Sequence, residues 1–114
     1  MSQHLRIVRG TSNAFGISVT DEKGNPYTLT EDQVLIFGLK CDEYSDERVL
    51  VKKITNAVDG EYYLELTPKD TADLEPGRYF CDVGMQQGDG VFYNVIECRP
   101  FFIAPNVTQL GDGA

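Results

Sequence analysis

Few residues of this 114-residue chain have the types and spacing that enzyme chemistry requires. The one imidazole belongs to His4, among the first few residues, where chains commonly fray. Nucleophilic catalysis needs a nucleophile beside a base that a third group orients, and no serine stands in a Gly-x-Ser-x-Gly pattern. A Cys–His pair would form only if His4 met a thiol in space. We therefore predict no catalytic residues and a protein that is not an enzyme.

Three cysteines, Cys41, Cys81 and Cys98, are the next candidates for chemistry. Zinc sites usually draw their ligands from short paired spacings, which this chain lacks. The odd count and an N-terminus without a signal-peptide pattern predict reduced thiols in a protein made in the cytoplasm. Cysteine often behaves as a small buried hydrophobe, so Cys41 and Cys81 are predicted to lie in the core. We predict no metal and no cofactor, with a Cys₃His site as the alternative.

Carboxylates cluster at 42–47 and at Asp21–Glu22. Paired carboxylates can hydrolyse glycosides, but a domain of this size is not expected to have loops long enough for a deep cleft around them. Solvated charged turns are the first interpretation. A calcium site made from Asp42, Asp46 and a loop carbonyl remains the alternative.

The charge of the chain limits its partners. Eighteen acidic and ten basic side chains give a formal net charge of −8. This balance argues against nucleic acid and against anionic membranes, which both need clustered Lys and Arg. The first interpretation is solubility, and a cationic partner or a divalent ion is the alternative.

Apolar residues alternate with a period of two along most of the chain, which predicts strands. One strand has a core face of Leu35, Phe37, Leu39 and Cys41, and Lys52 and Lys53 indicate a strand at a sheet edge. The residues 56–60 are predicted to form a turn, and Pro100 a break or bulge. The expected strands cover residues 4–9, 14–20, 34–41, 48–54, 61–66, 78–86, 91–97 and 101–104.

One helix is predicted, near residues 68–74. Thr67 can cap it, Pro68 suits the first helical position, and Pro76 and Gly77 stop it. A strand that begins with Tyr79 follows this corner. The arrangement resembles the tyrosine corner of immunoglobulin-like sandwiches, although the second-strand cysteine and the strand-C tryptophan are missing.

The strand count and turn spacing predict an all-β, immunoglobulin-like antiparallel β-sandwich of about seven or eight strands. A β-barrel is the competing architecture. We expect a single domain over residues 1–110 and a flexible tail over 111–114.

Aromatic residues on outward positions are the candidate binding surface. If Tyr62 faces the core, alternation directs Tyr63 outward, and the same reasoning applies to Tyr93 and Phe102. We predict that Tyr63, Tyr93 and Phe102 form a protein interface. The alternatives are the rim of the core or a platform of tyrosines for carbohydrate.

A wider resemblance covers residues 5–108. Segments such as Asp-Gly-Glu-Tyr-Tyr-Leu-Glu-Leu-Thr and Leu-Glu-Pro-Gly-Arg-Tyr-Phe-Cys-Asp-Val-Gly resemble the β-sandwich domains of tailed bacteriophages and prophages, in particular the N-terminal domain of baseplate upper proteins. No fibre or receptor-binding region follows residue 114, so the chain is either a stand-alone adaptor or a shortened protein.

This resemblance implies a non-enzymatic structural or assembly protein of a phage tail or baseplate. Such a protein is made in the bacterial cytoplasm and assembled into a virion. The expected partners are other phage structural proteins and the chain itself, as a homo-oligomer, with no nucleic acid and no membrane. A carbohydrate-binding or adhesin-like module is the alternative function.

Overall fold

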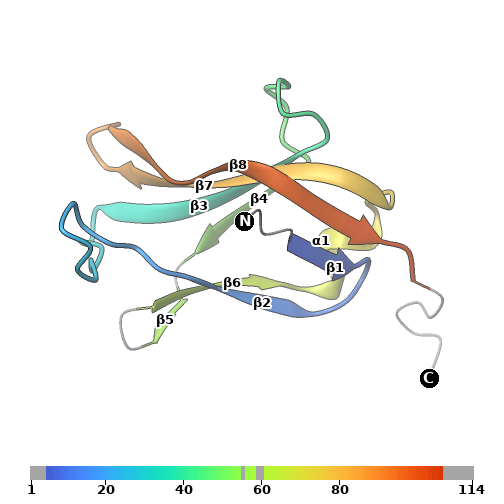
Figure 1. Cartoon of the computed structure of the whole chain (residues 1–114), viewed down its shortest axis with the longest axis horizontal. Coiled ribbons are helices and arrows are strands. Elements are labelled where there is room, and N and C mark those ends of the chain that lie inside the picture. The colour runs from blue at the N-terminus through green and yellow to red at the C-terminus, as the bar shows by residue number, and fades with distance from the viewer. Residues whose placement is uncertain (1–4, 55, 59–60, 107–114) are drawn as a thin grey trace.

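The computed structural model describes residues 5–54, 56–58 and 61–106. The chain forms two facing layers of β-strands, joined by one short helix (Figure 1). The strands are β1 (Leu5–Val8), β2 (Asn13–Ile17), β3 (Gln33–Lys40), β4 (Leu50–Ile54), β5 (Asn56–Val58), β6 (Glu61–Leu66), β7 (Gly77–Gln87) and β8 (Phe92–Ala104), and the helix is α1 (Pro68–Ala72).

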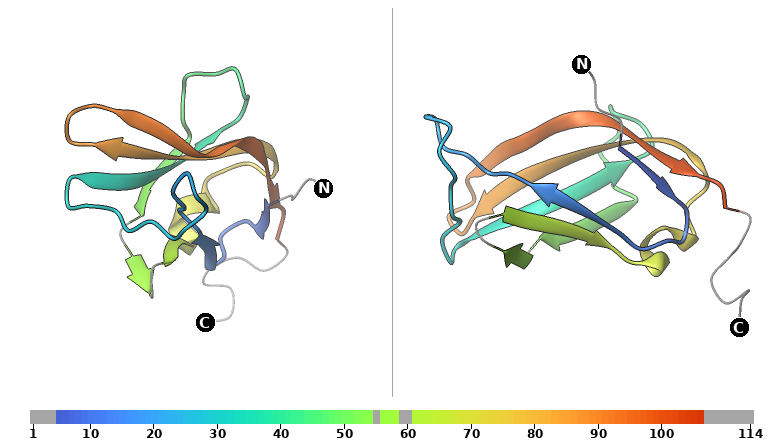
Figure 2. Two further views of the ribbon diagram at one scale, coloured as in Figure 1. Left: turned by 60° about the vertical axis from the view of Figure 1, so that its left-hand side comes forward. Right: turned by 60° about the horizontal axis from the view of Figure 1, so that its bottom comes forward.

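One layer has the strand order β1-β8-β7-β3-β4 and the other β2-β6-β5 (Figure 2). Every pairing is antiparallel except that of β1 with β8. In immunoglobulin domains the B, E and D strands share one sheet and the C, F and G strands the other, and these eight strands follow that order. The prediction of an immunoglobulin-like sandwich with one short helix is confirmed, and the alternative of a closed barrel is wrong because the two sheets are separate.

The core lies between the sheets, where alternate side chains of each strand meet. On β3, Leu35, Phe37 and Leu39 are at most 1% exposed. Phe101 of β8 is fully buried, and its ring centroid lies 6.3 Å from that of Phe15 and 6.0 Å from that of Phe37. Because Phe15 belongs to β2 in the opposite sheet, this aromatic contact joins the two layers.

The prediction that Cys41 continues the core face of β3 is wrong. The strand ends at Lys40, and the Cys41 side chain is exposed. The chain turns here because the Asp42 side chain accepts a hydrogen bond from the backbone N–H of Tyr44 (3.0 Å), and the Asp42 carbonyl accepts one from the N–H of Ser45 (3.1 Å). Because of this local turn, the strand ends at Lys40, one residue before the end of the apolar alternation in the sequence.

The break predicted at Pro100 is wrong, because Pro100 pairs in register with Phe80 inside β8, whereas the predicted bulge is present beside it, between Arg99 and Ile96. Proline removes one ladder N–H, but its fixed φ lies within the extended region, so the strand continues. The register shifts opposite Cys81 to Gly84, where β8 has extra residues.

The segment 56–60, predicted as a turn, contains a strand. Asn56–Val58 form β5 and pair with Tyr63 to Glu61 of β6. A three-residue strand is too short for apolar alternation to be recognised in the sequence, which explains the wrong prediction.

The edge position predicted from Lys52 and Lys53 is confirmed, because β4 is the last strand of its sheet. Lys52 pairs with Phe37 and therefore faces inward, where its Nζ lies 2.7 Å from a carboxylate oxygen of Asp70 in α1. The same Asp70 oxygen accepts a hydrogen bond from the backbone N–H of Thr67 (2.7 Å), at the start of the helix. Asp70 therefore both caps α1 and holds the helix against the sheet edge.

We expect the Asp70→Ala variant to lose about 1–2 kcal/mol of unfolding free energy, because one substitution removes the helix cap and the partner of Lys52. Burial raises the pKa of Asp70, but the hydrogen bonds from Lys52 and Thr67 outweigh it and hold that pKa below the ordinary value. The stabilisation is thus present above about pH 4 and is lost as the pH falls through the lowered pKa. Urea titrations from neutral to acidic pH measure this loss.

Asp73→Ala is the matched control, since Asp73 is an exposed carboxylate at the other end of α1. We expect its stability to stay within about 0.5 kcal/mol of the parent. Equal losses for the two variants, or a loss at Asp70 that does not change with pH, would contradict the assigned role.

The corner between α1 and β7 contains the three residues predicted to form it. The Tyr79 hydroxyl donates a hydrogen bond of 2.6 Å to the backbone carbonyl of Glu75, and the Tyr79 ring is buried. Gly77 has a φ of +148°, which side chains disfavour, and Pro76 before it is exposed. The corner sets the direction in which β7 enters the five-stranded sheet.

Candidate functional site

The three aromatic residues predicted to form an interface lie on three separate surfaces. Tyr63 is half-buried on the outer side of the three-stranded sheet, and its hydroxyl donates to a Glu61 carboxylate oxygen at 3.1 Å. Tyr93 is 51% exposed and lines a cleft at one end of the five-stranded sheet. Phe102 is half-buried on the outer side of that sheet. The structure therefore does not unite them in one platform.

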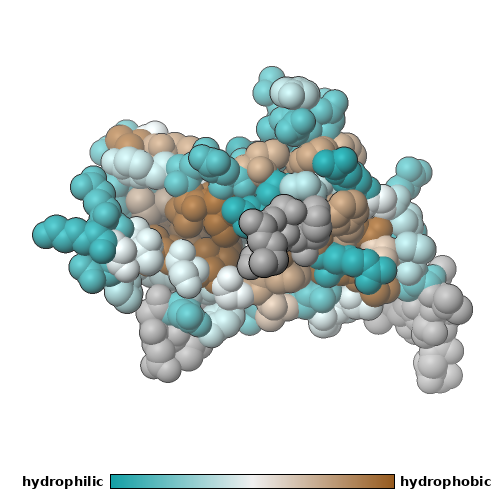
Figure 3. Space-filling view, viewed as in Figure 1, coloured by the Kyte–Doolittle hydropathy of each residue, from teal (hydrophilic) through white to brown (hydrophobic). Residues whose placement is uncertain are grey.

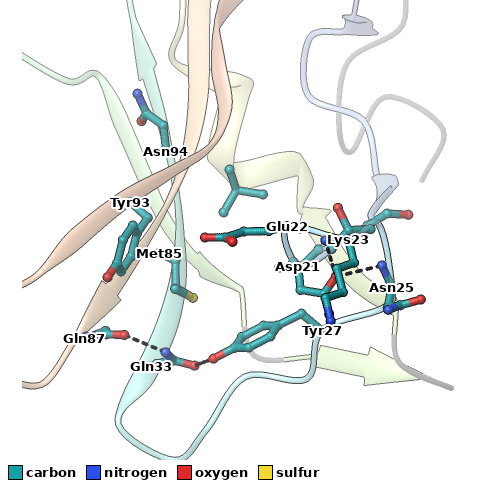
Figure 4. Close-up of a pocket in the computed structure, with 14 residues that line it drawn as sticks. Asp21, Glu22, Lys23, Asn25, Tyr27, Gln33, Met85, Gln87, Tyr93 and Asn94 are labelled. Atoms are coloured by element: carbon teal, nitrogen blue, oxygen red, sulfur yellow. Dashed lines mark hydrogen bonds between the residues drawn. The ribbon is translucent and has the colours of Figure 1, made fainter.

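The cleft at Tyr93 has a volume of about 780 Å³. One wall is the hairpin that follows β2, and the other is formed by the end of β7 and the start of β8 (Figure 4). Glu22 extends from the hairpin toward the wall that carries Tyr93 and Met85 (Figure 4). Asp21 and Glu22 line this open cleft, whereas the sequence-based expectation concerned a deep cleft around paired carboxylates.

The hairpin wall is held by its own hydrogen bonds. Thr20 bridges to Pro26, and the Asp21 side chain accepts hydrogen bonds of 2.9 Å from the backbone N–H groups of Lys23 and Asn25. Gly24 supplies the left-handed residue of the turn, with a φ of +83°. These bonds form within the hairpin itself, so the wall is ordered without a ligand.

A chain of side-chain hydrogen bonds crosses the floor of the cleft. The Tyr27 hydroxyl donates to Oε1 of Gln33 at 2.8 Å, and Nε2 of Gln33 donates to Oε1 of Gln87 at 2.8 Å (Figure 4). Gln33 and Gln87 are also partners in the β3–β7 register. The floor thus fixes the hairpin segment against the five-stranded sheet.

The β7–β8 hairpin beside the cleft exposes three apolar residues in a row. Val91 is 39% exposed, Phe92 52% and Tyr93 51%. A Cβ atom at Gly84 would lie 2.0 Å from the Phe92 ring, so this ring rests directly on the bare backbone of β7. Figure 3 shows apolar surface between the sheets on this side, next to a hydrophilic hairpin. Phe92 and Tyr93 are consecutive in β8 and so face opposite sides of the hairpin, Phe92 over Gly84 and Tyr93 into the cleft. We call Val91, Phe92 and Tyr93, which cover the two sides of this hairpin, the hairpin patch.

Within the described residues, no group of three or more His, Cys, Asp or Glu side chains lies close enough to hold a metal ion. His4, which the Cys–His and Cys₃His alternatives need, lies outside those residues. The cleft holds tyrosine, amide and carboxylate groups, which suit recognition by stacking and hydrogen bonding.

Sequence reasoning found Tyr93 but missed the cleft around it. Its two walls come from segments that are distant in the chain, and no local pattern announces their contact. The glycine at position 84, inside an otherwise regular strand, was the one available signal that another group approaches the backbone there.

The three cysteines have different environments. Cys81 is buried between the sheets, whereas Cys41 and Cys98 are exposed. Burial raises the pKa of Cys81 to about 12, against the attraction of Arg99. Burial and the nearby carboxylates of Glu43 and Asp82 also raise the pKa of Cys98.

We expect two thiols, Cys41 and Cys98, to react with a thiol reagent in the native state, and Cys81 to react only after unfolding. The thiolate is the reactive form, so a buried thiol with a high pKa stays inert near neutral pH. Mass spectrometry of alkylated native protein measures the number and position of the labels. Labelling of Cys81 at the rate of Cys41 in folded protein would contradict the described core.

The helix α1 spans five residues, and no helix in the described part of the chain has the length and apolar character of a membrane span. No protein-family model and no curated protein matches the chain. Among solved structures, the chain is similar to murine CRIg, with 13% sequence identity and a TM-score of 0.44 over 92% of this chain and 93% of that chain. The immunoglobulin-like assignment rests on the strand order and pairing described above.

Proposed function

We propose that the chain is a non-enzymatic structural or assembly protein of a bacteriophage tail or baseplate and acts through protein–protein contacts. The observation that carries the proposal is the hairpin patch, where Phe92 and Tyr93 are each about half exposed. The two rings lie on opposite sides of the β7–β8 hairpin, so a partner that grips the hairpin would contact both, and aromatic residues are enriched in protein interfaces. The resemblance of residues 5–108 to baseplate domains supplies the assignment to a virion.

On this proposal the protein is made in the bacterial cytoplasm and becomes part of a particle. Its partners are other structural proteins of the phage and further copies of the chain. Its net charge of −8 agrees with a role away from nucleic acid and anionic membranes.

Complementation of a phage that lacks the gene tests the role of the patch. We expect a Phe92→Ser/Tyr93→Ser double variant to assemble at least about tenfold fewer infectious particles than the parent, because the truncated side chains no longer fill a partner's pockets. Tyr63→Ser, on the opposite sheet, is the control and should assemble normally. Thermal unfolding of both purified variants establishes that they fold. Normal assembly by the folded double variant would remove the patch from the proposal.

The cleft favours carbohydrate binding as a second candidate function. Tyr27 and Tyr93 line it together with Asn94 and Glu22, and rings beside amide and carboxylate groups are suited to sugar hydroxyls. Calorimetric titration with a panel of bacterial surface glycans tests this candidate. Binding that Tyr93→Ala abolishes supports it, whereas no heat with any glycan of the panel counts against it.

A further inference from the structure

The outer side of the five-stranded sheet carries an excess of positive charge in an acidic protein. Alternation along β1, β3, β4 and β7 directs core residues such as Ile7, Phe37, Ile54 and Val83 inward, and so directs their neighbours to this outer face. Five cations lie there, namely Arg6, Lys40, Arg48, Lys53 and Arg78. Asp82 is the one carboxylate among the described outward positions of these four strands, and the exposed Glu97 of β8 lies in the register shift opposite it. We call these five cations and the residues between them the basic face.

Strand pairing places cations around the aromatic residues of the basic face. Phe102 is the register partner of Arg6 on one side and of Arg78 on the other. The guanidinium of Arg78 lies 5.0 Å from the ring centroid of Phe80, whose register partner is Lys40. The predicted interface residue Phe102 is therefore part of a positively charged surface.

The other end of the basic face is more apolar. Val51 is 50% exposed and pairs with Gly38, over which the side chains of Arg48 and Asp82 both lie. Among the described residues, Lys52–Asp70 is the one ion pair, so none of the five cations forms an ion pair there, and Asp82 lies beside Arg48 over Gly38. A face with unpaired cations and exposed apolar groups fits an acidic partner surface.

The chain itself supplies such a surface. The loop between β3 and β4 rises beyond the basic face, away from the three-stranded sheet (Figures 1 and 2). Its exposed carboxylates are Asp42, Glu43, Asp46 and Glu47. They surround Tyr44, whose side chain is 87% exposed, the largest value among the exposed apolar residues. We call residues 42–47 the acidic loop.

We propose that two copies of the chain associate through their five-stranded sheets, with the acidic loop of each copy seated on the basic face of the other. Because loop and face lie side by side in one copy, a two-fold axis lets both contacts form at once. Tyr44 would then pack against the aromatic and arginine groups of the partner's face. The inference deepens the proposed function, since it rests on a role in protein contact and names one partner as a second copy.

Sedimentation velocity on the full chain tests the association. We expect a reversible dimer at about 20 mM NaCl that weakens at least about tenfold at about 0.5 M NaCl, because the contacts are ionic and exposed to screening. A chain that remains monomeric at millimolar concentration in low salt would overturn the proposal and leave the face to an acidic partner of another kind. A dimer that is insensitive to salt would overturn it as well.

A charge exchange identifies the two surfaces. Arg6→Glu/Lys53→Glu/Arg78→Glu changes the summed charge of the five face positions from +5 to −1, and Glu43→Lys/Asp46→Lys/Glu47→Lys changes that of the four loop positions from −4 to +2. Each variant alone should therefore self-associate at least about tenfold more weakly than the parent. Mixed together, the two variants should form a heterodimer, because a reversed face meets a reversed loop and an unchanged face meets an unchanged loop. This recovery also demonstrates that both variants are folded.

Lys23→Glu/Lys69→Glu is the matched control, since these exposed or half-exposed lysines lie away from the basic face. This variant should dimerise as the parent does, while failure of the mixed variants to associate would refute the pairing. The hairpin patch is unchanged in all these variants. If the charge-exchanged variants fail to associate while phage assembly still depends on Phe92 and Tyr93, that combination of results would thus count against the dimer and not against the proposed function.

Discussion

Replacing Phe101 with alanine is expected to lower the free energy of unfolding by about 3–5 kcal/mol. The Phe101 side chain is 0% exposed and contacts Phe15 and Phe37 from the two sides of the core. Its removal leaves a cavity between the sheets and also breaks the aromatic contact that joins them. The total free energy of unfolding of a domain is on the order of 5–15 kcal/mol, so this loss removes a large part of it.

Urea titration followed by circular dichroism measures this loss. Tyr44→Ala is the control, because an aromatic side chain is removed there from a position that is 87% exposed, and its effect should stay within about 0.5 kcal/mol. A loss below about 1 kcal/mol for Phe101→Ala would mean that the two sheets are held together elsewhere.

The second large effect is expected at the corner. Tyr79→Phe keeps the buried ring and removes only the hydroxyl that donates 2.6 Å to the carbonyl of Glu75, and we expect a loss of about 1–2 kcal/mol. Tyr93→Phe removes a hydroxyl from an exposed ring and should have almost no effect on stability.

The pH dependence gives a further readout of the corner. Burial, with the nearby Cys41 and Glu75, raises the pKa of Tyr79. A group whose folded pKa is raised stabilises the fold below its unfolded pKa, so this contribution is lost as the pH rises above about 10. The parent should therefore approach the stability of Tyr79→Phe in alkaline solution. A constant difference across that range would contradict the role of the phenol as a donor.

Local patterns in the sequence were sufficient for most of the fold. Alternation over Leu35, Phe37 and Leu39 marks a strand with one buried side, and that arrangement is present. The residues Thr67 to Gly77 contain a helix cap, a stop and a corner within a few positions, so their structure follows from local chemistry. The same holds for the edge strand, where two adjacent lysines disfavour a central position.

The errors arose where the apolar pattern competes with a local turn or with a contact formed elsewhere. Cys41 fits the apolar alternation, but the hydrogen bonds of Asp42 end the strand one residue earlier. The strand β5 exists because β6 offers it a partner, which composition alone does not reveal.

The candidate site was less predictable than the fold. Sequence alternation identified Phe102 as an outward residue, but the cations beside it come from β1 and β7, at opposite ends of the chain. The cleft likewise depends on the contact of Gln33 with Tyr27 and Gln87. Such surfaces are products of strand pairing, and single-sequence patterns carry no information about which strands pair.

Quantitative mass spectrometry of gradient-purified phage particles tests the central claim most directly. If the chain is a tail or baseplate component, it should be present in particles from a strain that encodes it, at a fixed copy ratio to the other tail subunits and resistant to washing. Recovery of the chain only in the soluble fraction, with particles that are complete and infectious without it, would contradict the proposed function.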